Sequence, residues 1–303
     1  MLKHNLVILV LLSLFANGMC LELKAETSEA AAITGARRFP VVNIWRGTSV
    51  KDEVWLTPHI ASPSGSPAVI VCPGGSYFWH DTKNEGTLVA EWLQKNGISA
   101  FVLNYRTANV SSYMFRTRLF VRGHRYPDPQ EDLQQAILHV KDNAGVYGID
   151  TALVGAMGFS AGGHLVMSVA EKYTSLRSRP SFVVPVYPVV SFAAECTHKR
   201  SRRGLLGDDD RNNRELIEKL SLEKHVPKDC PPVFLVNCKD DPIVDYRNSV
   251  LLDSALTSQN VEHVYLQYET GDHGFGASET KGTEECREWK REFIIWFKNL
   301  FAR

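Results

Sequence analysis

The sequence predicts a single α/β domain in which a mostly parallel central sheet carries helices on both faces. Short apolar runs rich in β-branched residues recur along the chain, and segments of helical period separate them. No internal repeat, low-complexity tract or linker interrupts residues 41–303. Strands that alternate with helices build parallel sheets covered on both faces, so this order favours one domain of that class.

The six clearest strands are near-continuous apolar runs, as a sheet buried on both faces requires. We predict them at Ala68–Cys72, Ala100–Leu103, Leu153–Met157, Phe182–Val186, Val233–Asn237 and His263–Gln267. Helical patterns occur near residues 85–96, 162–173, 213–223 and 246–258. Two further helices each show one apolar face, formed by Leu133, Ala136, Ile137 and Val140, and by Trp289, Phe293, Trp296 and Leu300.

Two long irregular stretches, residues 107–126 and 190–211, interrupt this alternation. Both are long for connections in an α/β domain, and long loops are often functional. Each follows a predicted strand, and sites in such sheets lie at the carboxyl ends of the strands. We therefore expect both stretches to border the functional site.

The balance of charges narrows the possible functions. The 303 residues contain 34 Lys+Arg and 34 Asp+Glu, so the formal net charge is zero, which argues against a nucleic-acid-binding protein. The one basic cluster, Lys199–Arg203, is either a solvated loop or a patch that binds anions, and short charge runs favour the solvated loop. The oligomeric state stays open.

The N-terminus has the pattern of a signal peptide over residues 1–18. Lys3 and His4 precede the apolar run Leu6–Phe15, which is too short to span a bilayer but suits the core of an export signal. Cleavage fits small residues between positions 18 and 25, and a polar lead-in follows to residue 40. We expect an exported protein, periplasmic or secreted, with no integral membrane span.

Cys20 offers an alternative to simple cleavage at the N-terminus, because bacterial lipoprotein processing could attach a lipid anchor to it. Met19 before it fits that processing poorly, so cleavage without lipidation is favoured. None of the six cysteines forms a Cys-x-x-Cys pair, so no zinc site is expected. Cys72 and Cys238 end apolar runs and are predicted to be buried thiols, while any disulfide pairing stays open.

The strongest chemical motif is Gly158-Phe159-Ser160-Ala161-Gly162. It follows the predicted strand Leu153–Met157 and opens a helical run, which is the setting of a nucleophilic serine on a sharp turn between strand and helix. Glycines two residues before and after the serine avoid clashes in so tight a turn. Taken alone, the motif is also compatible with a Gly-rich turn whose serine caps the helix.

The segment Pro73-Gly74-Gly75-Ser76-Tyr77 follows another predicted strand, where an oxyanion hole would be expected. Backbone N–H groups must come within about 3 Å of the reacting oxygen, which glycine permits. Gly75, Ser76 and Ala161 are our candidate donors. A tight turn without a catalytic role is the alternative.

An acid and a base follow the serine in the order that this arrangement requires. Asp240 and Asp241 come after the strand Val233–Asn237, and His273 comes after the strand His263–Gln267. We predict Asp241 as the acid, because it begins the pattern Asp-x-hydrophobic-Val, which is usual at the functional carboxylate. Asp240 is predicted to be a turn or supporting residue. The sequence thus predicts a Ser160-His273-Asp241 triad.

Three further residues near these motifs need a role. His164 is four residues after Ser160, but a serine on this turn points away from the following helix, so we expect His164 to be structural. Tyr77 and Trp79 follow the candidate oxyanion turn. Their rings are predicted to contact substrate by stacking on sugars, with packing of the domain's own surface as the alternative.

Taken together, these motifs resemble the bacterial α/β-hydrolase carbohydrate esterases of the acetyl xylan esterase and feruloyl-esterase-like (BD-FAE-type) group. The resemblance extends from about residue 40 to the end. It is carried by Cys72–Gly75, Asn104-Tyr105-Arg106, Arg125-Tyr126-Pro127, Gly158–His164, Val186–Val189, Ser201–Arg203, Leu205–Gly207, Asp240-Asp241, Asn248-Ser249 and His273–Gly276. It implies the α/β-hydrolase fold and hydrolysis of acyl esters on plant cell-wall carbohydrate, without a metal or organic cofactor.

The chain departs from the family pattern at Ser76, Asp272 and Asp245, where glycine, glycine and proline are usual. None of these changes removes a predicted catalytic group, so they bear on acyl and sugar preference more than on the reaction. The partner is expected to be an acylated carbohydrate or a small ester. A prolyl-oligopeptidase-like peptidase, a general short-chain esterase or lipase, and a non-catalytic binding protein are the alternatives.

Overall fold

The computed structural model describes residues 39–62, 64–114 and 123–301. Pro40–Arg303 forms one compact unit. The predicted signal peptide, nearly all of the lead-in and Cys20 lie outside the described residues, so export stays a prediction. None of the helices in the described ranges is both long and apolar enough to cross a membrane.

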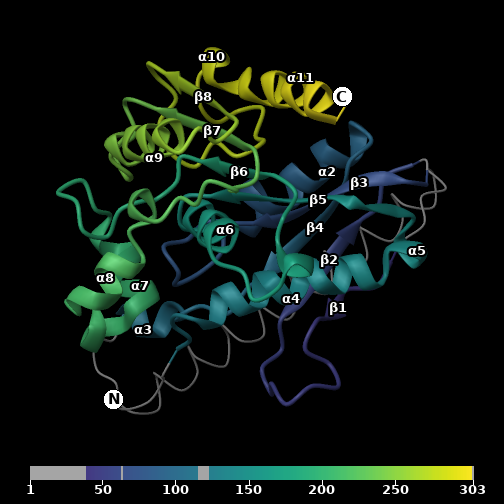
Figure 1. The fold of residues 1–303 in the computed structure, drawn as a ribbon, viewed down its shortest axis with the longest axis horizontal. Coiled ribbons are helices and arrows are strands. Elements are labelled where there is room, and N and C mark those ends of the chain that lie inside the picture. The colour runs from purple at the N-terminus through teal and green to yellow at the C-terminus, as the bar shows by residue number, and fades with distance from the viewer. Residues whose placement is uncertain (1–38, 63, 115–122, 302–303) are drawn as a thin grey trace, which may run out of the picture. The chain divides into compact units, whose positions relative to one another are not determined.

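An eight-stranded sheet with the order β1-β2-β4-β3-β5-β6-β7-β8 forms the centre of the described unit (Figure 1). The six strands from β4 to β8 in that order are parallel, whereas β1 and β2 pair antiparallel at the opposite end. The strands are β1 (Val42–Asn43), β2 (Trp55–His59), β3 (Ser66–Cys72), β4 (Ser99–Asn104), β5 (Ile149–Phe159), β6 (Val183–Val186), β7 (Val233–Cys238) and β8 (His263–Tyr268). This arrangement confirms the predicted fold class.

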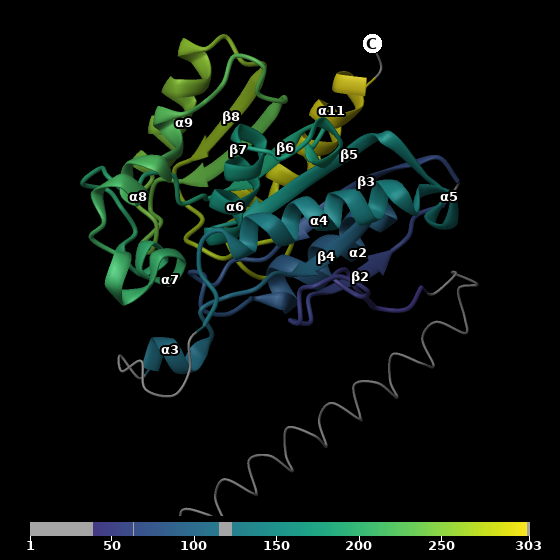
Figure 2. The same cartoon turned by 60° about the horizontal axis from the view of Figure 1, so that its bottom comes forward.

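Helices connect the strands and cover the sheet. The α-helices are α2 (Leu88–Lys95), α3 (Val110–Met114), α4 (Asp128–Asp142), α5 (Ala144–Tyr147), α6 (Ala161–Glu171), α7 (Lys199–Asp210), α8 (Arg214–Lys219), α9 (Arg247–Ser258), α10 (Glu284–Arg287) and α11 (Trp289–Phe301). A π-helical turn, η1 (Thr82–Thr87), precedes α2, and short 3₁₀ turns occur at η2 (Leu176–Ser178) and η3 (Leu222–Lys224). Figure 2 shows α3, α7 and α8 near one another, away from α5.

The main core cluster lies between the sheet and the helices α2 and α11. Alternate residues of β3, Val69 and Val71, share this cluster with Leu93 of α2 and Phe293 of α11, and all four are fully buried. Alternation along a strand sends the intervening residues to the opposite face. There α4 packs on α6, so helices cover both faces of the sheet, as predicted.

Three details differ from the sequence prediction. The strands β1 and β2 were not expected, since their segments lack a long apolar run. The strand β8 is only half-buried along its whole length, because it is the last strand of the sheet and not an interior one. The stretch 190–211 contains the helix α7, so the prediction of a solvated loop at Lys199–Arg203 is wrong.

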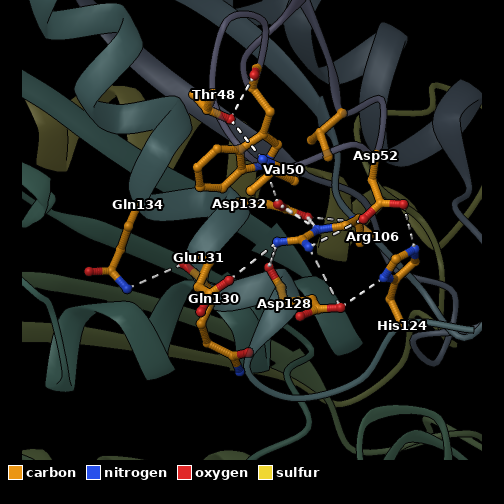
Figure 3. A network of polar contacts seen from close by, with 12 residues as sticks. Thr48, Val50, Asp52, Arg106, His124, Asp128, Gln130, Glu131, Asp132 and Gln134 are labelled. Carbon is orange, nitrogen blue, oxygen red and sulfur yellow. Dashed lines mark hydrogen bonds and ion pairs between the residues drawn. The ribbon is translucent and has the colours of Figure 1, made fainter.

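A buried cation joins the antiparallel end of the sheet to α4. Arg106, which follows β4, lies 2.9 Å from Asp132 of α4, and the Asp132 side chain is fully buried (Figure 3). The indole N–H of Trp45, in the β1–β2 connection, donates to the same carboxylate at 2.7 Å. The rim of the network is formed by Asp52, His124, Asp128 and Glu131. Breaking a pair of this kind leaves an uncompensated buried charge, so the network fixes α4 against the sheet.

The packing of α11 supports a first prediction. Phe293 is fully buried, whereas Ile295 on the same helix is 48% exposed. Truncating a buried phenylalanine leaves a cavity, so Phe293→Ala should lower the free energy of unfolding by about 3–5 kcal/mol. Ile295→Ala is the matched control and should cost less than about 1 kcal/mol. Urea unfolding followed by tryptophan fluorescence measures both; equal losses would contradict this packing.

Candidate active site

Ser160 lies on a sharp turn between β5 and α6, as the motif predicted. Its φ is +54°, a left-handed conformation that non-glycine residues adopt only where the surrounding structure enforces it. A Cβ on Gly158 would lie 2.0 Å from the carbonyl oxygen of Gly162, and a Cβ on Gly162 would lie 2.0 Å from that of Cys72. Both glycines are therefore required for the helix to approach the two strand ends so closely.

The candidate acid and base meet as predicted. Asp241 Oδ2 lies 2.6 Å from His273 Nδ1, and the Asp241 side chain is 1% exposed. The other carboxylate oxygen, Oδ1, accepts the backbone N–H groups of Ile243 at 2.8 Å and Val244 at 2.9 Å. Because both oxygens are engaged, the carboxylate is held in one orientation and presents Oδ2 to the imidazole.

Asp240 has the supporting position expected for it. Its Oδ1 accepts the backbone N–H groups of Gly271 and Asp272, each at 2.9 Å. Asp272 in turn accepts the N–H of His273 at 2.7 Å. Neighbouring aspartates therefore divide two tasks, since Asp241 contacts the imidazole and Asp240 holds the loop that carries it.

The candidate oxyanion loop places backbone N–H groups near Ser160. Gly75 has a φ of +139°, and a Cβ there would lie 2.1 Å from the carbonyl oxygen of Trp79, so only glycine fits. Across the ranges that the structure describes, the N–H groups of Gly75, Ser76 and Ala161 have no hydrogen-bond acceptor. Donors left free in this way are what an oxyanion hole requires.

The aromatic residues after this loop differ in position. Tyr77 is only 1% exposed, and its hydroxyl lies 2.9 Å from His164 Nδ1, so its ring faces the interior. The prediction that the Tyr77 ring stacks on a sugar is therefore wrong. Trp79 is half-buried, with the Arg200 guanidinium 5.5 Å from its ring centre, and its role in substrate binding stays a prediction.

His164 has the structural role expected of it. It is fully buried, stacks on Phe192 at 4.6 Å, and its Nε2 lies 2.9 Å from the Leu220 carbonyl oxygen. Burial is the main reason that its pKa falls to about 4. A neutral imidazole held on both nitrogens has no free position for a substrate.

Glu85 is a residue that the sequence analysis missed. This buried side chain of η1 accepts the Gly74 N–H at 2.7 Å through Oε2 and the Tyr187 hydroxyl at 2.8 Å through Oε1. The same hydroxyl accepts the Gly276 N–H at 3.0 Å, and the Tyr187 ring packs on His273 with ring centres 4.6 Å apart. One carboxylate thus holds both the oxyanion loop and the loop of the base.

Glu85 also shows how the candidate groups converge. A Cβ on Gly74 would lie 2.9 Å from the Ser160 Cβ and 2.7 Å from Glu85 Oε2. On the other side, a Cβ on Gly274, the residue after His273, would lie 4.0 Å from Glu85 Oε1. The serine, the oxyanion loop and the Asp241-His273 pair therefore surround one point at the carboxyl ends of β3, β5, β7 and β8.

A sequence signal for Glu85 exists. It precedes Val89 and Leu93 by four and eight residues, so it extends the buried face of α2 toward its N-terminus. A glutamate on an apolar helical face is rarely buried without partners, and this marks it as a candidate for a structural or catalytic task. Tyr187 lies in the motif Val186–Val189, which supports the resemblance but gives this tyrosine no role.

Metal-binding side chains do not gather at this site. Within residues 39–62, 64–114 and 123–301, no group of three or more His, Cys, Asp or Glu residues could hold a metal ion. Cys72, Cys196, Cys230, Cys238 and Cys286 are buried free thiols, as predicted for Cys72 and Cys238.

The sharp turn between β5 and α6 that carries Ser160 is a nucleophile elbow. The fold and this elbow serine, followed by an acid and a histidine at strand ends, define the class of α/β hydrolases. Within that class, the model of the BD-FAE family matches residues 54–256, about two thirds of the sequence. The chain belongs to the BD-FAE family, which confirms the resemblance inferred from its motifs.

Similar proteins include two curated relatives. The chain is 35% identical to "Acetylxylan esterase" of Xylanibacter ruminicola over 71% of its own length and 42% of the relative. It is 32% identical to "Endo-1,4-beta-xylanase B" of Butyrivibrio fibrisolvens over 68% of its own length and 32% of the relative. The chain therefore spans less than half the length of these two proteins.

A solved structure matches nearly end to end. The acetyl ester-xyloside bifunctional hydrolase from Caldicellulosiruptor lactoaceticus is 30% identical, with a TM-score of 0.74 over 88% of this chain and 97% of that one. A truncated carbohydrate esterase from gut microbiota shares the fold with a TM-score of 0.71 at 19% identity.

The elbow supports a second prediction. Gly162→Ala places a Cβ 2.0 Å from the Cys72 carbonyl oxygen, so α6 must move away from β3. We expect a loss of at least about 2 kcal/mol in the free energy of unfolding. Gly145→Ala in α5 is the matched control, because a Cβ there meets nothing within 4 Å. Thermal unfolding should show the control unchanged or slightly stabilised; a tolerated Gly162→Ala would contradict the close approach.

Glu85 supports a third prediction. Burial raises its pKa above the ordinary 4.5, against the opposing effects of His273, Tyr187 and Gly74. The folded state thus favours the protonated carboxyl, and its contribution to stability falls as the pH rises from about 4.5 through the raised pKa. Glu85→Gln has no such proton, so its stability should decline less than that of the wild type over this range.

Urea unfolding at a series of pH values measures this difference. Glu215→Gln, at an exposed glutamate on α8, is the control and should follow the wild-type curve. A constant offset between Glu85→Gln and the wild type at every pH would show that the folded protein does not shift the titration of Glu85.

Proposed function

We propose that this chain is a serine carboxylic ester hydrolase that removes acyl groups, acetyl foremost, from plant cell-wall carbohydrate such as xylan. The observation that carries the proposal is the Asp241-His273 contact of 2.6 Å, at the same strand ends as the elbow Ser160. An oriented imidazole beside a serine on a strained turn is the arrangement that activates a hydroxyl for attack on a carbonyl carbon.

The reaction proceeds in two stages. Ser160 Oγ attacks the ester carbonyl while His273 takes its proton, and Asp241 stabilises the imidazolium that forms. The N–H groups of Gly75, Ser76 and Ala161 donate to the oxyanion of the tetrahedral intermediate. The tetrahedral intermediate then collapses, and His273 protonates the departing sugar oxygen, which leaves as a hydroxyl and an acyl-Ser160 ester remains. Water, deprotonated by His273, cleaves this ester and releases the acid.

The proposed substrate rests on the relatives. The names of three of them contain xylan, xylanase or xyloside, and two of the three names specify an acetyl ester or esterase activity. Family membership supports an esterase, and these names support an acylated carbohydrate over other esters. The predicted signal peptide agrees with a polymeric substrate outside the cell, and we include export in the proposal.

A fourth prediction tests the function. Ser160→Ala should lower kcat for release of acetate from acetylated xylan by about 10⁴-fold or more, because the nucleophile is lost. Mass spectrometry of the products from acetylated and feruloylated xylan, with both proteins in parallel, identifies the acyl group. Acetate release within about tenfold of the wild type would rule out Ser160 as the nucleophile.

Asp241 and Asp240 provide a matched pair of control variants. Asp241→Asn should cost on the order of 10⁴-fold in kcat, because an amide can donate to the imidazole and favours the wrong tautomer. Asp240→Asn keeps an oxygen for the Gly271 and Asp272 N–H groups, so its loss should stay below about tenfold. The reverse ranking would assign the role of acid to Asp240.

A further inference from the structure

A basic hollow of about 480 Å³ lies beside α7, lined by residues from its start and from just beyond its end. The side chains of Lys199, Arg200, Arg202, Arg203 and Arg211 line it together with Tyr113 of α3. The long stretches 107–126 and 190–211 of the sequence analysis contribute these residues. The basic cluster is therefore part of a concave surface and not of a solvated loop.

The positive charge of this hollow is only partly balanced. Arg203 lies 2.8 Å and Arg211 3.7 Å from the same carboxylate, that of Asp208. In the described part of the chain, no ion pair joins Lys199, Arg200 or Arg202 to an acidic residue. Burial, and then repulsion by Arg211, lower the pKa of Arg202. A bound anion would relieve this repulsion.

The hollow adjoins the candidate active site. Arg200 Nε donates to Ser76 Oγ at 2.9 Å, and Ser76 is a candidate oxyanion residue. Burial, followed by repulsion from Arg200, lowers the pKa of His198, which precedes α7, to about 4. A ligand with its ester at Ser160 can therefore extend into the hollow.

Aromatic rings border the same surface. The rings of Trp79 and Tyr113 lie 5.4 Å apart at an interplanar angle of 78°, and Arg200 covers Trp79. The half-buried Trp79 and the exposed Tyr113 offer apolar faces of the kind that pack on sugar rings. Cations beside such faces suit a saccharide that carries a negative charge more than a neutral one.

We propose that this hollow binds a carboxylate of the substrate, carried by a uronic acid residue of the acylated carbohydrate. Guanidinium groups match the geometry of a carboxylate and form two parallel hydrogen bonds with it. The substrate class is thus an acylated acidic saccharide. This inference rests on the proposed esterase function for the position of the ester, but the hollow itself can be tested without catalysis.

Kinetics on paired substrates provide the first test. Two acetylated xylo-oligosaccharides that carry either one glucuronic acid or one glucose residue at the same position differ only at C6, where a carboxylate replaces a neutral hydroxymethyl group. The wild type should favour the acidic substrate in kcat/KM, and added salt should reduce this preference. Lys199→Glu reverses the charge of an exposed side chain outside the proposed triad, and it should lower the acidic-to-neutral ratio at least about tenfold. Lys298→Glu makes the same charge change on α11 and should leave the ratio within about twofold.

Two outcomes of this comparison overturn the proposal. One is a wild type that shows no preference for the acidic substrate, and the other is a preference that Lys199→Glu leaves intact. A third substrate, a hemisuccinate ester of a neutral xylo-oligosaccharide, carries its carboxylate on the acyl group. If only this ester shows the Lys199-dependent gain, the carboxylate belongs to the acyl group and the uronic acid assignment is wrong.

Calorimetry separates this inference from the esterase proposal. Ser160→Ala should bind a deacetylated xylo-oligosaccharide with glucuronic acid at least about tenfold more tightly than the neutral oligosaccharide, and Lys199→Glu should remove the difference. If Ser160→Ala shows this difference in binding but the wild type hydrolyses none of the esters, the hollow is supported and the esterase function is overturned. If the wild type hydrolyses the esters but Ser160→Ala binds the acidic and neutral oligosaccharides equally, only the proposed role of the hollow is overturned.

Discussion

The close approach of α6 to the ends of β3 and β5 is the constraint on which the rest of the site depends. Only residues without a Cβ fit at Gly158 and Gly162, because a Cβ at either position would lie 2.0 Å from a backbone carbonyl oxygen. This contact holds Ser160 in its left-handed conformation, with a φ of +54°. The same contact brings the first turn of α6, and with it the N–H of Ala161, beside the loop that follows β3. The geometry of the nucleophile and that of its oxyanion donors thus have one cause.

The sequence predicted the buried part of the fold well, and the exposed part less well. Strands β3 to β7 carry long apolar runs because helices cover them on both faces, so their sequences alone reveal them. β1 and β2 pair at the antiparallel end and lack such runs. The helix α7 escaped prediction because the basic cluster Lys199–Arg203 was interpreted as a solvated loop. In the structure, Gly204 is needed for close packing, since a Cβ there would lie 2.2 Å from the Ser76 carbonyl oxygen.

The candidate site divides in the same way. Ser160, Asp241 and His273 each follow a strand and have local spacing that reveals them, and the structure brings Asp241 and His273 into contact. Tyr77 was misjudged because the direction of a side chain after a turn depends on backbone angles that spacing does not contain; its φ is +63°. Tyr187 and Glu85, 102 residues apart, become partners only through the tertiary fold. No local pattern could have joined them.

The bridge that Glu85 forms between Gly74 and Tyr187 has a consequence for the divergence of related enzymes. The oxyanion loop and the loop of the base share this buried carboxylate, so their sequences cannot change independently. A substitution that moves one loop also moves Glu85, and with it the other loop. Variation in substrate choice is then confined to surfaces that this residue does not contact. The segments around α3 and α7 are such surfaces, so new specificities in this lineage should arise there while the reacting centre stays unaltered.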